Sequence, residues 1–289
     1  MSLDWSLAMH GGAGPLSRDS YSESERHMAD TLKSGAAALS TGARAIDVVQ
    51  AAVEALEDCG HHIAGRGASA NALGQWELDA AIMEGRTRQA GSVAALRGFR
   101  SPITAARTVM DECPHVLLVG KGAGLFLKPF NLKRVWNPGA YYKPSVDRPV
   151  TPGELAHGTV GAVARDSHGA LASATSTGGV LGKMPGRVGD SPLIGAGTWA
   201  DERVAVSCTG QGEYFIRAAV AADVSARVRY GRQGLFDAAN AALQDVRFLG
   251  GDGGLIAVDV LGNVTMPFLS EGMKRGVATS SGQFEVATR

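Results

Sequence analysis

A threonine that directly follows a glycine stands at the head of an apolar run in the middle of the chain. The run reads Gly158-Thr159-Val160-Gly161-Ala162-Val163-Ala164 and favours a strand. An internal threonine hydroxyl has no base of its own. If the Gly158–Thr159 bond is cut, Thr159 gains an α-amino group, whose pKa of about 7.7–8 suits a general base for the adjacent hydroxyl. The pair therefore predicts either an ordinary strand after a turn glycine or the nucleophile of a self-cleaving hydrolase.

Further motifs follow in a fixed order and favour the second interpretation. They are His10-Gly11-Gly12-Ala13-Gly14, Thr175-Ser176-Thr177-Gly178-Gly179, Pro185-Gly186-Arg187-Val188-Gly189-Asp190-Ser191-Pro192, Thr209-Gly210-Gln211-Gly212 and Gly250-Gly251-Asp252-Gly253-Gly254. Over nearly the whole chain, this series resembles the plant-type L-asparaginase/isoaspartyl peptidase family of N-terminal-nucleophile hydrolases. The resemblance implies an α/β fold, a four-layer αββα sandwich of the N-terminal-nucleophile (Ntn) hydrolase type. It also implies one domain over residues 1–289 that cleaves itself into an α subunit, 1–158, and a β subunit, 159–289.

The resemblance assigns catalytic roles to three threonines. Thr159 is the nucleophile, and Thr177 hydrogen-bonds and orients it. The Thr209 hydroxyl and the Gly210 N–H stabilise the oxyanion that forms when an amide is hydrolysed, which is often the largest catalytic contribution. Read alone, Thr177 is a strand-end threonine and Thr209-Gly210 a tight turn.

Arg187 and Asp190 stand three residues apart between glycines. A guanidinium binds a carboxylate through paired hydrogen bonds, and an aspartate can hold an ammonium group. The pair therefore fits the head of a free amino acid, although residue types alone favour a salt bridge across a surface turn. In the resembling family this motif is the substrate clamp, with Gly212 at the amino end of the substrate. The glycines that take part in self-cleavage correspond to Gly11, Gly12 and Gly158.

The chain departs from the family pattern at two asparagines, which are replaced by Ile63 and Leu269. Ile63 makes the predicted pocket less polar beside the nucleophile. The same loop of the family wraps a structural sodium ion with backbone carbonyls, and the resemblance places these at Leu56, Glu57, Cys59, His62, Ala64 and Arg66. No other cofactor is expected.

Charge and cysteine content restrict the class of partner. Lys and Arg total 28, as do Asp and Glu, so charge favours neither a nucleic acid nor a membrane surface as a partner. The three cysteines are isolated, which argues against a disulfide framework. The chain shows no signal-peptide pattern and no run of the ~18 apolar residues that a membrane span needs. We expect a cytoplasmic enzyme that acts on a small amino acid or dipeptide, and the family's usual state implies a dimer of αβ units.

Periodicity and turn residues predict the following elements. Strands are expected over 6–9, 77–83 and 90–96, a buried strand over 115–119, a hairpin after Thr159 and a last hairpin over 254–260 and 263–268. Helices are expected over 22–39, 45–57, 102–112, 213–229 and 235–246. A proline-rich linker over 129–157 ends at the predicted cleavage point.

The favoured hypothesis is an autoprocessed threonine amidohydrolase that acts on L-asparagine and β-aspartyl (isoaspartyl) dipeptides. Two alternatives share the fold: a glycosylasparaginase-like amidase, which needs room for a sugar, and a binding protein that does not cleave itself. A glycine-rich nucleotide-binding protein is a third alternative, but the phosphate-loop and dinucleotide fingerprints are missing.

Overall fold

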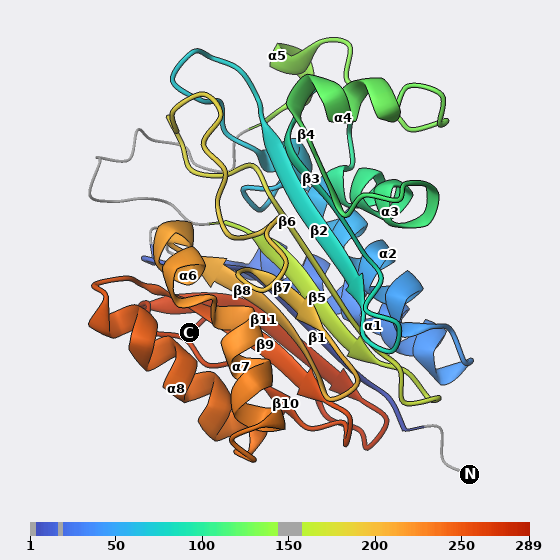
Figure 1. The fold of residues 1–289 in the computed structure, drawn as a ribbon, viewed down its shortest axis with the longest axis vertical. Coiled ribbons are helices and arrows are strands. Elements are labelled where there is room, and N and C mark those ends of the chain that lie inside the picture. The colour runs from blue at the N-terminus through green and yellow to red at the C-terminus, as the bar shows by residue number, and fades with distance from the viewer. Residues whose placement is uncertain (1–3, 17–19, 144–157) are drawn as a thin grey trace.

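The computed structural model describes residues 4–16, 20–143 and 158–289, so the last part of the proline-rich linker, 144–157, lies outside the described residues. Its largest element is an eight-stranded sheet with the order β12-β11-β1-β5-β6-β2-β3-β4 (Figure 1). Neighbouring strands are antiparallel except for β3 and β4. The bounds are β1 Ser6–Gly14, β2 Leu78–Glu84, β3 Ala90–Leu96, β4 Leu117–Val119, β5 Val160–Arg165, β6 Leu171–Thr177, β11 Gly272–Thr279 and β12 Phe284–Ala287.

A second, four-stranded antiparallel sheet has the order β10-β9-β8-β7. Its strands are β7 Thr198–Ala200, β8 Val204–Gly210, β9 Gly253–Asp259 and β10 Val264–Thr265. It packs against the large sheet through contacts of β8 and β9 with β1 and β5, and of β7 and β8 with β6. The apolar contact between the sheets includes Ala8, Val163, Ala205 and Ile256, all fully buried.

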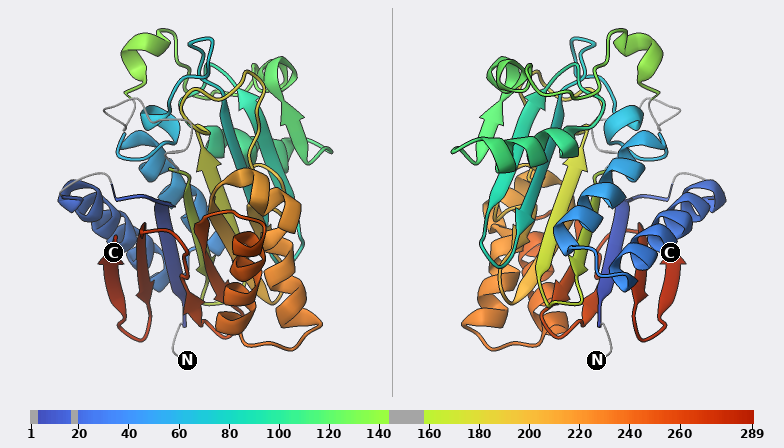
Figure 2. Two further views of the ribbon diagram at one scale, coloured as in Figure 1. Left: turned by 90° about the vertical axis from the view of Figure 1, so that its left-hand side faces the viewer. Right: turned by 90° about the vertical axis from the view of Figure 1, so that its right-hand side faces the viewer.

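The helices fall into two groups (Figure 2). One group packs against the large sheet: α1 Ser22–Ser40, α2 Ala45–Asp58 and α3 Pro102–Glu112. The other packs against the small sheet: α6 Gly212–Ala218, α7 Val220–Arg229 and α8 Leu235–Phe248. Three short helical segments, η1 Gly65–Gly67, α4 Gly120–Phe126 and α5 Pro138–Tyr141, belong to connections. The fold is thus mixed α/β, as the sequence predicts.

The helix α2 illustrates why the helices pack on the sheets: each buries an apolar face. Val49, Val53 and Leu56 recur at helical spacing and are fully buried where α2 contacts β5 and β6. Burying each such side chain contributes about 1.5–3 kcal/mol. Within residues 4–16, 20–143 and 158–289, no helix is both long and apolar enough to cross a membrane.

Four predicted elements differ from the structure. The second strand of the last hairpin, expected over 263–268, is the two-residue strand β10. The strand expected over 6–9 continues through the glycine loop to Gly14, with an irregularity in its pairing to β11 between His10 and Ala13. The strand expected to be buried near 115–119 is the exposed edge strand β4. The helix expected over 213–229 is divided into α6 and α7 at Ala219, whose φ is +48°.

Candidate active site

Thr159 is buried and lies directly before β5, which is a central strand of the large sheet. Its hydroxyl donates to Oγ1 of Thr177, 3.2 Å away at the end of the neighbouring strand β6. The Thr177 oxygen also accepts from the Gly179 N–H at 3.0 Å. Two adjacent strand ends therefore bring the predicted nucleophile and its predicted orienting residue into direct contact.

Gly158 is tightly enclosed by the loop that carries Ile63. A Cβ atom on Gly158 would lie 2.5 Å from Cγ1 of Ile63 and 2.7 Å from its backbone nitrogen, closer than real Cβ atoms come. The Ile63 carbonyl in turn accepts the Gly178 N–H at 2.7 Å, next to Thr177. Only glycine therefore fits before Thr159. Leu269, at the other departure from the family pattern, instead packs against the core between the small sheet and its helices.

Asp190 is 3% exposed and lines the same small cavity as Thr159, Arg187 and Gly210. Burial raises the pKa of Asp190 to about 7, although the nearby Arg187 lowers it. Its Oδ2 atom is buried and has no hydrogen-bond partner among the described residues. A buried carboxylate oxygen without a partner is costly, and a cationic donor entering the cavity would satisfy it.

Arg187 is held by Glu213, a residue that the sequence analysis does not identify. The guanidinium donates from Nε and Nη2 to the two carboxylate oxygens of Glu213 at 2.9 and 3.0 Å. This paired geometry fixes the plane of the guanidinium beside the cavity. No spacing rule marks Glu213 in advance, because it lies 26 residues from Arg187 at the start of α6.

The predicted oxyanion residues lie at the end of β8. Oγ1 of Thr209 accepts the Ala13 N–H at 3.2 Å, so its own proton remains available for donation. Gly210 lines the cavity, whereas Thr209 is not among its lining residues. Gly212 is adjacent to the clamp: a Cβ there would lie 2.8 Å from Oδ1 of Asp190.

The glycine loop at the end of β1 packs against His62. A Cβ on Gly11 would lie 2.3 Å from Cε1 of His62, and the Gly11 carbonyl is 2.9 Å from its Nδ1. Gly12, with φ +105°, has a backbone conformation that favours glycine. Neither Gly11 nor Gly12 lines the cavity around Thr159. Both lie in the strand that continues to Ala13, the partner of Thr209.

A buried ion pair anchors the loop that carries the clamp. Nζ of Lys183 lies 3.9 Å from Oδ2 of Asp79 and donates to the Glu77 carbonyl at 2.8 Å, and the side chains of Lys183 and Asp79 are fully buried. Asp79 is the register partner of Thr177 in the large sheet. The clamp loop is thereby fastened to β2, the strand that pairs with the Thr177 strand β6.

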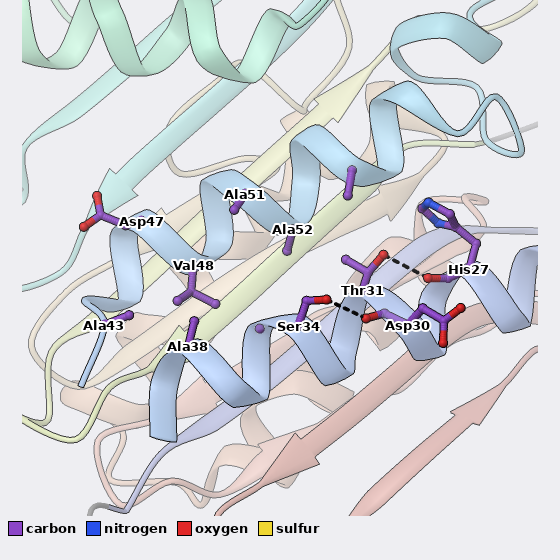
Figure 3. Close-up of a pocket in the computed structure, with 12 residues that line it drawn as sticks. His27, Asp30, Thr31, Ser34, Ala38, Ala43, Asp47, Val48, Ala51 and Ala52 are labelled. Carbon is purple, nitrogen blue, oxygen red and sulfur yellow. Dashed lines mark hydrogen bonds between the residues drawn. The ribbon is translucent and has the colours of Figure 1, made fainter. Parts of the chain in front are cut away.

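A second cavity, between α1 and α2, contains none of the predicted site residues. Its lining is mostly small side chains, among them Ala38, Ala51 and Ala52, with His27 and Asp30 at one end (Figure 3). The cavity around Thr159 is therefore the candidate active site, because it unites the hydroxyl of the predicted nucleophile with a guanidinium and a carboxylate oxygen that has no hydrogen-bond partner among the described residues.

Comparison with known proteins identifies the family. The chain matches the family model described as Asparaginase over residues 3–143 and 137–288. It is 45% identical over 292 residues to the isoaspartyl peptidase of Salmonella typhimurium, a match that covers 93% of each chain. It is 43% identical over 293 residues to the isoaspartyl peptidase of Escherichia coli, covering 93% of this chain and 91% of that relative. It is 37% identical over 320 residues, 98% of each chain, to a probable isoaspartyl peptidase/L-asparaginase 2 of Arabidopsis thaliana. The chain belongs to this asparaginase family, and the resemblance seen in its motifs is confirmed.

Proposed function

We propose that this protein is an autoprocessed threonine amidohydrolase that hydrolyses L-asparagine and β-aspartyl dipeptides. Its relatives are named as isoaspartyl peptidases, and one as a probable isoaspartyl peptidase/L-asparaginase, which supports this activity. The unpartnered Oδ2 of Asp190, in the same cavity as Arg187 and Thr159, is the observation that carries the substrate class. An α-amino acid head presents an ammonium to Asp190 and a carboxylate to Arg187, which directs its side-chain amide towards Thr159.

Self-cleavage comes first in this mechanism. Oγ1 of Thr159 attacks the Gly158 carbonyl carbon, the peptide C–N bond breaks, and the acyl group passes from nitrogen to oxygen as the amine takes up the proton. Water then hydrolyses the ester, which releases the Gly158 carboxylate and restores the Thr159 hydroxyl. The missing side chain of Gly158 supports this step, because the contact with Ile63 leaves no room for one.

The freed amine then serves as the base for the second reaction. It takes the proton of the Thr159 hydroxyl as the oxygen attacks the substrate amide. The Thr209 hydroxyl and the Gly210 N–H stabilise the oxyanion. Ammonia or an amino acid leaves with the proton, and water hydrolyses the resulting aspartyl ester. The Thr159–Thr177 hydrogen bond supports the orienting role of Thr177.

The same proposal covers the finer description of the fold. We assign the two packed sheets and their two groups of helices to the four-layer αββα sandwich of Ntn hydrolases, one domain that cleaves into 1–158 and 159–289. The supporting observations are the contacts between the sheets and the helices on each of them. The dimer of αβ units and the cytoplasmic location stay predictions.

The loop that follows α2 has features that fit a sodium ion. A Cβ on Gly65 would lie 2.5 Å from the Glu57 carbonyl oxygen, and one on Gly67 would lie 2.0 Å from that of His62, so glycines let the loop approach a carbonyl in the last turn of α2 and one of its own. The carbonyls that would hold the ion are those of Leu56, Glu57, Cys59, His62, Ala64 and Arg66. A bound ion would stabilise the loop that places Ile63 beside Gly158.

Hydrolysis assays test the proposed function. Purified protein, once processed, should release leucine from β-aspartyl-leucine and ammonia from L-asparagine, whereas Thr159→Ala should remain one chain and do neither. A protein that cleaves N-acetylglucosaminyl-asparagine better than both substrates would support the glycosylasparaginase-like alternative. A chain that stays whole and binds L-aspartate without hydrolysing β-aspartyl-leucine would support the binding protein.

A further inference from the structure

A line of buried polar side chains crosses the space between the two sheets, beginning at Thr159. Nδ1 of His10, in β1, lies 3.1 Å from the Thr159 carbonyl oxygen. Nε2 of the same ring lies 2.9 Å from Oγ of Ser207, in β8. That oxygen lies 2.7 Å from Oγ1 of Thr175, in β6, and Thr175 lies 2.7 Å from Oγ1 of Thr198, in β7. These four side chains belong to residues that are fully buried.

The far end of this line reaches the substrate clamp. Oγ1 of Thr198 lies 3.0 Å from the carbonyl oxygen of Ser191, the residue after Asp190. A second backbone contact, from the Gly197 N–H to the Asp190 carbonyl at 3.1 Å, lies beside it. The polar line therefore joins the residue that carries the nucleophile to the segment that carries the clamp carboxylate, through four different strands.

The atoms at the Thr159 end determine the direction of the hydrogen bonds from His10 as far as Thr198. A carbonyl oxygen can only accept, so Nδ1 of His10 must carry a proton. Burial lowers the pKa of His10 to about 3, so the ring is neutral and Nε2 is bare. Ser207 must then donate to Nε2, which leaves its oxygen to accept from Thr175. Thr175 must in turn accept from Thr198. This uses the single proton of the Thr198 hydroxyl, so the directed hydrogen bonds end at Thr198, and the bond to the clamp segment is the one from the neighbouring Gly197 N–H to the Asp190 carbonyl. One tautomer of one histidine thus orients three hydroxyl groups.

The sequence makes room for this line at Gly161. A Cβ on Gly161 would lie 2.0 Å from Oγ of Ser207 and 2.4 Å from Nε2 of His10. Gly161 is the register partner of His10 in the pairing of β1 with β5. Its missing side chain explains why a glycine stands inside a strand that is otherwise apolar.

We propose that His10 is a positioning residue that holds the Thr159 backbone and, through Ser207, Thr175 and Thr198, couples it to the clamp segment. This inference rests on the proposed function, in which cleavage removes the covalent restraint on the amino side of Thr159. After cleavage Thr159 is still joined to the chain through its carbonyl group, and the hydrogen bond from His10 fixes that group. A carbonyl held in this way keeps the new amine and the hydroxyl aligned with a substrate that Asp190 fixes from the other end.

The test compares two identical substitutions. Ser207→Ala removes the donor to His10, and Ser173→Ala removes an equally buried hydroxyl on β6 that donates instead to the Val206 carbonyl at 2.7 Å. In fully processed protein, we expect Ser207→Ala to lower kcat for β-aspartyl-leucine by about tenfold or more, with KM within about twofold, because small misplacements of a nucleophile are costly. Ser173→Ala should leave kcat within about twofold. Equal losses in the two variants would overturn the proposal.

If Ser207→Ala does not fold, a second pair of variants, at Thr175, tests the same proposal. Thr175→Val keeps the shape of the side chain and removes the hydroxyl, whereas Thr175→Ser keeps the hydroxyl and removes a methyl group. Lower kcat in Thr175→Val than in Thr175→Ser supports an oriented hydroxyl line. Equal kcat in these variants, or a lower value in Thr175→Ser, overturns it.

Nitrogen NMR of the imidazole provides a readout that does not require activity. The proton of His10 should lie on Nδ1, and the carbonyl carbon shift of Thr159 should move in Ser207→Ala but not in Ser173→Ala. A proton on Nε2, or an unmoved carbonyl shift, overturns the proposal. If instead the parent protein neither cleaves itself nor hydrolyses substrate, the proposed function fails, and the NMR result still decides whether His10 holds Thr159.

Discussion

Replacing Asp190 with asparagine should remove substrate binding and, above neutral pH, stabilise the fold. Burial raises the pKa of Asp190 from 3.8 to about 7. At about 1.4 kcal/mol per pH unit, ionising this carboxyl in the folded protein costs roughly 4 kcal/mol. Because the folded-state pKa is raised, stability is fully present below pH 3.8, falls as the pH rises towards 7, and is constant above it. Asp190→Asn has no proton to lose and avoids this cost.

The assay is thermal unfolding of both proteins between pH 5 and pH 8. The advantage of Asp190→Asn should grow by roughly 3 kcal/mol over this range, or about 5 °C in Tm. Any effect of the amide on packing is independent of pH and cancels in this comparison. L-Aspartate should raise the Tm of the parent and not that of the variant. A Tm difference that is the same at every pH would refute the argument that Asp190 is an uncompensated buried acid.

Four further results are expected. Below about pH 7, the kcat/KM for β-aspartyl-leucine should fall more steeply than about tenfold per pH unit, because protonated Asp190 cannot hold the substrate ammonium and a protonated Thr159 amine cannot act as the base; an acid limb no steeper than this in a pH-rate profile would contradict the role of Asp190. Arg187→Lys loses the paired hydrogen bonds and should lower kcat/KM by about tenfold or more while self-cleavage, followed on denaturing gels, continues at the parent rate; unchanged turnover would contradict the clamp. Gly158→Ala should slow self-cleavage by roughly five- to hundredfold, since overpacking costs about 1–3 kcal/mol. Adding Ile63→Ala to this variant should not restore the rate, because the backbone nitrogen of residue 63 remains 2.7 Å from the added Cβ; a parent-like rate in the single or the double variant would contradict the steric argument. Ile63→Asn should raise kcat/KM for L-asparagine relative to β-aspartyl-leucine by roughly five- to hundredfold, from about 1–3 kcal/mol of restored polar contact; an unchanged ratio would show that Ile63 does not tune the site.

Elements whose apolar residues recur with a clear helical or strand period could be predicted from the sequence. The exceptions depend on contacts with residues far along the chain. The hairpin after Thr159 and the helix α2 follow their sequence patterns. The break at Ala219 does not, because no glycine or proline marks it. The N–H groups of Ala221 and Ala222, in the first turn of α7, donate to the carbonyls of Ala196 and Gly195. These bonds satisfy N–H groups in the first turn of α7 that an uninterrupted helix would satisfy internally.

In the candidate site, too, local motifs could be predicted from the sequence, whereas contacts between distant residues could not. Motif order singled out Thr159, Thr177 and Asp190, and the structure brings these three residues to one cavity. The hydrogen bonds of the clamp and of the nucleophile carbonyl depend on Glu213 and His10, whose partners lie 26 and 149 residues away. A lone histidine in an apolar strand and a glutamate at a helix start carry no spacing signal. Their hydrogen-bond partners become visible only once the chain is folded and the two sheets are packed together.

The central claim is that Thr159 becomes an N-terminal nucleophile, and intact-mass measurement of the purified protein tests it most directly. We predict two fragments, one ending at Gly158 and one beginning at Thr159, that appear together with hydrolysis of β-aspartyl-leucine. Amino-terminal sequencing of the smaller fragment should begin Thr-Val-Gly. A single chain of full mass that hydrolyses β-aspartyl-leucine at an undiminished rate would contradict the account, because the Thr159 amine would then play no part in catalysis.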